Sequence, residues 1–79
     1  MVKKMKDMGV GDRGRVSGYE RGLDAYRNKL LSMGLTKGTE FIINRVAPMG
    51  DPVEIIVRGY HLSLRKDEAT ALFVEGLGK

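Results

Sequence analysis

The chain contains no cysteine and no tryptophan, and it has one histidine, two prolines, three tyrosines and two phenylalanines in 79 residues. The lack of cysteine excludes disulfides and thiolate metal sites, and it suits a reducing compartment. No apolar run approaches the roughly 18–20 residues that a membrane-spanning helix requires. The basic start, residues 1–6, lacks the apolar core of a signal peptide. We therefore expect a cytoplasmic protein.

The length, composition and charge of the chain limit the classes of protein to which it can belong. We expect residues 1–79 to form a single domain, because a chain this short holds one modest core. Its content of 42% apolar and 30% charged residues is typical of a globular domain and too apolar for disorder. The net charge is +4, but the basic residues are scattered. A dedicated nucleic-acid binder would show a basic stripe interleaved with aromatic residues, so we expect no specific nucleic-acid partner.

The residues that carry enzyme chemistry are also scarce. His61 is the sole histidine, and only Asp67 and Glu68 are adjacent acids. The pattern G-x-G-x-x-G occurs over residues 9–14, but a strand pattern follows it, and a nucleotide fingerprint needs a helix there. The sequence therefore predicts a protein that is not an enzyme, with no catalytic residue, no metal site and no cofactor.

Most of the chain has the pattern of short strands. Residues 53–57 and 60–64 alternate between apolar and polar positions, as in half-buried strands. Residues 40–46 are β-branched and aromatic with imperfect alternation, which indicates a bulge. Two further strands are expected at residues 15–19 and 72–74. Five short strands in so small a chain favour a mainly β fold closed into a small barrel, because closure removes exposed sheet edges.

One helix is expected over residues 25–33, with Asp24 as its N-cap. Gly34 is placed as the left-handed residue that ends the helix, followed by Leu35, which can pack back on Leu30. A single C-terminal helical turn is expected at residues 67–69. One apolar stripe would face the core, formed by Leu23, Tyr26, Leu30 and Met33.

Two apolar residues fall where a core does not clearly need them. Leu31 lies off the helix stripe beside Arg27, and Met49 lies at a turn between Pro48 and Gly50. One interpretation is that Leu31 widens the core stripe and Met49 folds over a barrel end. The functional interpretation is a partner-binding surface. Its candidate residues are Arg27, Lys29, Leu31 and Met49.

Several segments resemble one known family. Residues 26–35 read Tyr-Arg-x-Lys-Leu-Leu-Ser-Met-Gly-Leu, and residues 45–52 read Arg-Val-Ala-Pro-Met-Gly-Asp-Pro. With the glycine turn Gly38-Thr39 and the strand end 62–66, they resemble the FeoA family of small components of bacterial ferrous iron transport. The resemblance covers nearly the whole chain from about residue 9.

The resemblance implies an SH3-like β-barrel that binds FeoB, a membrane transporter of Fe(II) with a cytoplasmic GTPase region. It implies an accessory or regulatory role, contact with the membrane only through that partner, and a third small Feo component as a further candidate partner. Two alternatives stay open. A basic face gathered by the fold would favour a nucleic-acid-binding SH3-like barrel, and three converging oxygen or nitrogen ligands would favour a metal-sensing regulatory domain.

Overall fold

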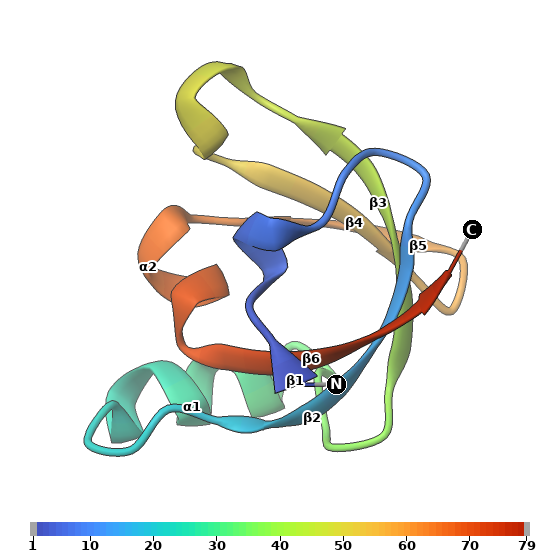
Figure 1. Cartoon of the computed structure of the whole chain (residues 1–79). Coiled ribbons are helices and arrows are strands. Elements are labelled where there is room, and N and C mark those ends of the chain that lie inside the picture. Colours follow the sequence, from blue (N-terminus) through green and yellow to red (C-terminus); the bar gives the residue numbers. More distant parts are fainter. Residues whose placement is uncertain (1, 79) are drawn as a thin grey trace.

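The computed structural model describes residues 2–78, which form one antiparallel sheet of six strands in the order β1-β6-β2-β3-β4-β5 (Figure 1). β1 and β5 are the two edges. The strands are β1 (Val2–Lys3), β2 (Arg13–Tyr19), β3 (Glu40–Val46), β4 (Val53–Val57), β5 (Tyr60–Leu64) and β6 (Leu72–Gly78). The α-helices are α1 (Asp24–Ser32) and α2 (Lys66–Thr70), and the 3-10 turns are η1 (Met5–Asp7) and η2 (Pro48–Gly50).

The sheet curves around one core, as the period-two pattern predicts. Val53, Ile55 and Val57 of β4 are buried, while the residues between them are half-buried. β3 and β4 shift register between Ile43 and Arg45, which confirms the expected bulge. Two helices and η1 contribute further side chains to this core. Its fully buried large residues are Met5, Val16, Leu30, Leu35, Phe41, Ile43, Ile55, Leu64, Leu72 and Val74.

The strands differ from the sequence prediction in number and length. The sixth strand is β1, whose two residues pair with Glu75 and Val74 of β6. Gly14, the last glycine of the G-x-G-x-x-G pattern, lies in β2. A Cβ there would come within 2.6 Å of Phe41 Cζ and 2.9 Å of Met8 Cε. Gly14 is therefore a close-packing residue that admits the Phe41 ring to the core.

Helix α1 begins differently from the prediction. Leu23 is the N-cap residue and no side chain caps the helix, so the assignment of Asp24 as N-cap was wrong. Asp24 is the first helical residue, where its carboxylate favourably faces the positive end of the helix dipole. The predicted stripe is confirmed, because Leu30 is fully buried and Leu23, Tyr26 and Met33 pack against the core.

The C-terminus of α1 is a Schellman motif. The Leu35 N–H donates to the Leu30 carbonyl at 3.0 Å, and the Gly34 N–H donates to the Leu31 carbonyl at 3.0 Å. Gly34 has a φ of +88°, the left-handed conformation that glycine adopts without strain. The reversal places Leu30 and Leu35 together in the core, both with no exposed surface.

Replacing Gly34 by alanine should therefore lower the free energy of unfolding by about 1–2 kcal/mol, because a Cβ is strained in the left-handed conformation. Urea denaturation measures the change. Gly9→Ala is the matched control, since Gly9 does not have a positive φ and a Cβ there meets nothing closer than 3.8 Å. Equal stability of the two variants would contradict the prediction.

Candidate functional site: a lysine-lined groove

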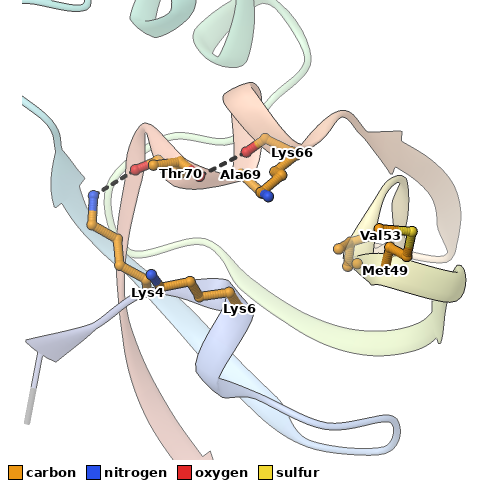
Figure 2. A pocket seen from close by; sticks show the side chains of 8 residues that line it. Lys4, Lys6, Met49, Val53, Lys66, Ala69 and Thr70 are labelled. Atoms are coloured by element: carbon orange, nitrogen blue, oxygen red, sulfur yellow. Dashed lines mark hydrogen bonds between the residues drawn. The ribbon is translucent and has the colours of Figure 1, made fainter.

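A pocket of about 310 Å³ opens between the N-terminal segment, α2 and the β3–β4 turn. Figure 2 shows Lys4 and Lys6 on one side of it, Lys66 and Ala69 from α2 on another, and Met49 and Val53 on a third. We call it the lysine groove. Its lining residues are Lys4, Lys6, Met49, Gly50, Val53, Lys66, Ala69 and Thr70.

Met49 forms an exposed apolar wall of the lysine groove. It lies in η2 at the tip of the β3–β4 hairpin, and 96% of its surface is exposed. Its φ of 66° and ψ of 14° match the third residue of a type II turn, where glycine or asparagine is preferred. The Gly50 N–H closes the turn by donating to the Ala47 carbonyl at 2.9 Å. The hairpin thus holds an apolar side chain in water on a strained backbone.

The three lysines of the groove differ in their surroundings. Lys4 Nζ lies 2.7 Å from the Glu20 carboxylate, donates to the Thr70 carbonyl and lies 4.2 Å from the centroid of the Phe73 ring. Lys6 and Lys66 are exposed, and neither forms an ion pair within residues 2–78. None of the lining residues is acidic. The charged side chains that line the groove are therefore all basic.

A carboxylate also connects two walls of the groove. Asp51 follows η2, and its Oδ1 accepts the backbone N–H of Lys66 at 3.1 Å. This bond ties the β3–β4 turn to the start of α2. It engages the backbone of Lys66 and leaves the side-chain ammonium outside the interaction.

The structure does not bring the four predicted partner-binding residues into one patch. Arg27, Lys29 and Leu31 lie on α1, and Met49 lies on η2 at the other end of the view in Figure 1, with α2 between the two elements. Leu31 is 37% exposed. The Arg27 guanidinium lies 5.8 Å from the centroid of the Tyr19 ring. The expected surface is thus divided between two regions.

Lys29 forms an ion pair with Glu68 of α2. The Glu68 side chain is only 5% exposed, and its Oε1 accepts the Arg65 backbone N–H at 2.9 Å. The hydrogen bond from Lys29, together with the Arg65 backbone bond, holds the pKa of Glu68 below its usual value, although burial acts in the opposite direction. This buried carboxylate links α1 to α2, one wall of the groove.

Lys6, Lys66 and Glu68 are not predicted as site residues by the sequence. The two lysines are 60 positions apart in the chain, so only the fold brings them to one pocket. Glu68 is weakly indicated by its local position, because it is the third residue of α2. Its side chain accepts a hydrogen bond from the backbone N–H of the N-cap residue, as in a capping box. The expected Ser or Thr N-cap is replaced by Arg65, so the motif was not evident.

A second polar cluster lies on the outer face of β3, β4 and β5. The Glu54 carboxylate is 3.2 Å from His61 Nδ1 and accepts from Asn44 Nδ2 at 2.6 Å. The hydrogen bond with His61, followed by that with Asn44, lowers the pKa of Glu54. Within residues 2–78 no three His, Cys, Asp or Glu side chains converge as metal ligands would. The cluster is a cross-strand hydrogen-bond network.

Among the helices of residues 2–78, none has the length and apolar content needed to cross a membrane.

Comparison with known proteins identifies the family. The model of a family described as "FeoA domain" matches residues 3–76. The chain belongs to the FeoA family. This membership confirms the family resemblance, the small SH3-like β fold and the prediction of a non-enzymatic domain.

Solved structures of FeoA proteins have the same fold. A FeoA-like protein from Clostridium acetobutylicum is 37% identical, with a TM-score of 0.87 over 99% of this chain and 90% of that chain. A crystal structure named as an iron uptake regulatory protein, FeoA, is 34% identical, with a TM-score of 0.82 over 98% of this chain and 99% of that chain. The β-sheet and helices described above are thus those of the family.

A curated relative carries this domain within a much longer protein. It is the Fe(2+) transport protein A/Fe(2+) transporter FeoB fusion protein of Porphyromonas gingivalis, 29% identical over 72 residues. The match covers 91% of this chain and 8% of the relative, so the chain spans about a twelfth of that protein's length. In that relative a FeoA domain and a FeoB transporter share one polypeptide.

Removing the partner of a buried carboxylate leaves it desolvated and unpaired. Lys29→Met should therefore lower the free energy of unfolding by about 1–3 kcal/mol. The matched control is Lys37→Met, which removes an exposed ammonium outside this contact and should change stability by less than about 0.5 kcal/mol. Urea denaturation of both variants checks the difference. A Lys29→Met protein as stable as the control would contradict a stabilising link between α1 and α2.

Acidification should weaken the fold through Glu68. The pKa of Glu68 in the folded protein lies below the ordinary glutamate value of 4.5, so its stabilising contribution is present above about pH 4.5 and is lost as pH falls through the folded pKa. Glu68→Gln should therefore show a shallower loss of stability than the wild type between about pH 5 and 3. Glu40→Gln, which removes an exposed carboxylate, is the control. Parallel stability curves for the wild type and Glu68→Gln would contradict this assignment.

Proposed function

We propose that this protein is a cytoplasmic accessory subunit of bacterial ferrous iron uptake that binds a FeoB-type transporter, at the transporter's cytoplasmic GTPase region. The observation that carries the proposal is the fusion of a FeoA domain to FeoB in the Porphyromonas gingivalis relative. Fusion keeps two domains at a high effective concentration, and this favours the association of domains that bind one another. In this proposal the separate chain makes that contact by binding, and reaches the membrane only through the transporter.

The surface of the protein offers two places for such a contact. The first is α1, where Leu31 is partly exposed beside Arg27 and Lys29. The second is the lysine groove with Met49. Apolar anchors surrounded by charged residues are common at the centres of interfaces, which supports both as candidate contacts. A third small Feo component is a further candidate partner for whichever surface the transporter leaves uncovered.

The two alternative functions receive less support. The lysine groove gathers three lysines, but no aromatic residue lines it, and aromatic stacking is the usual complement to basic charge in single-stranded nucleic-acid binding. For metal sensing, His61, Glu54 and Asn44 meet on the outer sheet face, but Asn44 uses its amide Nδ2 to donate to Glu54, and no third His, Cys, Asp or Glu joins them within residues 2–78. We therefore propose neither.

The experiment that tests the proposal is affinity capture from detergent-solubilised membranes of the source bacterium, grown without oxygen. The tagged protein should recover the FeoB-type transporter, identified by mass spectrometry. The control is the same tag on Leu30→Ala, whose core is disrupted. If the tagged protein does not recover the transporter, even when the capture is repeated with a chemical cross-linker, the proposal is refuted.

The α1 surface gives a separate prediction. Leu31→Ala should weaken capture of the transporter while lowering the free energy of unfolding by less than about 1 kcal/mol, because the side chain is partly exposed. Leu30→Ala, one residue earlier, should lower it by about 2–5 kcal/mol, because Leu30 has no exposed surface. Thermal unfolding and transporter-dependent iron uptake measure the two effects. Full uptake by a stable Leu31→Ala protein would remove α1 from the interface.

A further inference from the structure

We propose that the lysine groove binds an acidic polypeptide segment that inserts one apolar side chain, and that this segment belongs to the FeoB-type transporter. The inference rests on the proposed function for the identity of the partner. Its chemistry comes from the groove itself, whose lining combines three lysines, an exposed methionine and small or branched apolar residues without any acid. Each part of this combination specifies one property of the occupant.

The charge of the groove specifies an anionic occupant. Lys6 and Lys66 approach the pocket from separate segments, η1 and α2, and neither has a carboxylate partner within residues 2–78. Lys4 is fixed by Glu20, Thr70 and the Phe73 ring. A positive concave surface attracts and orients carboxylates, and it repels basic segments. Carboxylates of the occupant would therefore meet Lys6 and Lys66.

The apolar lining specifies a side chain between those carboxylates. Val53 and Ala69 are buried beneath the groove, with 5% and 6% of their surface exposed, and Met49 forms the exposed wall. Methionine is flexible and adapts to the shape of the group it contacts. Gly50, which has no side chain, leaves the approach beside Met49 open. A leucine-sized side chain entering here would cover Met49, whose exposure otherwise has no stabilising effect.

The backbone at Met49 supports a binding role. A residue other than glycine or asparagine at a φ of 66° costs free energy, and such strain accumulates at functional sites. Glycine at this position would fold more easily, but it would remove the apolar wall. The sequence thus places an apolar side chain where the turn itself favours glycine.

The lining also discriminates between classes of anion. A nucleic acid would require an aromatic or arginine plane on which its bases could stack, and the lining contains neither. An anionic lipid surface is bound by a broad basic face, whereas this site is a pocket with three walls. A peptide with one apolar residue between carboxylates matches both the size and the polarity of the groove.

The first test uses a capped peptide of glutamates around a single leucine, titrated into isotopically labelled protein and followed by NMR. We expect chemical shift changes at the amides of Lys6, Met49, Lys66 and Ala69, weakening as salt rises. Replacing the peptide's leucine by serine should weaken binding at least threefold. Chemical shift changes that saturate only at residues outside the groove, or no chemical shift change at any residue, would overturn the proposal.

Variants of the groove supply the matched comparison. The double substitution Lys6→Glu with Lys66→Glu should weaken peptide binding at least tenfold, and Met49→Gly should weaken it while leaving the fold intact, since glycine accepts the turn conformation. Lys37→Glu changes the net charge of an exposed loop outside the groove and should alter affinity less than twofold. An equal loss of peptide affinity in Lys37→Glu would show that net charge alone drives binding, and would refute the groove as the binding site.

The second test uses the full-length FeoB-type transporter in detergent. If it binds wild-type protein and both groove variants equally, the groove inference fails and the proposed function stands. If the peptide binds the groove and the transporter does not bind wild-type protein, the proposed function fails and the transporter is excluded as the source of the segment. Tighter binding of single-stranded DNA or of phosphatidylglycerol vesicles than of the acidic peptide would overturn the inference in favour of those ligands.

Discussion

The structure depends on the reversal of the chain at Gly34. The left-handed glycine lets Leu35 turn back and join Leu30 in the core, with both side chains fully buried. This anchors the C-terminal end of α1 and thereby places Lys29 beside α2. There the ammonium of Lys29 compensates the buried carboxylate of Glu68. The Gly34 conformation thus supports the ion pair that joins α1 to α2, and α2 supplies Lys66 and Ala69 to the lysine groove.

The two sides of the groove are stabilised by different means. The α2 side depends on Glu68, whose hydrogen bond to the Arg65 backbone and ion pair with Lys29 hold the short helix in place. The hairpin side depends on the β3–β4 ladder and on the hydrogen bond that the Lys66 backbone N–H donates to Asp51. This last bond joins the two sides of the groove. A partner that bound here would contact a site whose walls are already positioned, which reduces the entropic cost of association.

Local patterns predicted the bounds of β3, β4 and β5 and the C-terminal end of α1, because these features depend on neighbouring residues. Alternation located β4, and the glycine after the leucine stripe located the end of α1. Strand β1 was missed because two residues are too few to show an alternation of apolar and polar positions. It forms only by pairing with β6 from the far end of the chain. The same reason hid the groove. Met49 was singled out as an exposed apolar residue, but its neighbours Lys6 and Lys66 come from distant segments and meet it only in the folded protein.

Stability and recognition are assigned to different residues at this end of the molecule. Val53 and Ala69 are buried and contribute to the core, and Lys4 is occupied by Glu20 and Phe73. Met49, Lys6 and Lys66 contribute little to folding, since Met49 is strained and exposed and neither lysine is paired within residues 2–78. Such side chains are costly or neutral for the isolated protein, which supports the proposal that they contact a partner. The same division makes the groove testable, because its recognition residues can be replaced without removing the core that holds them.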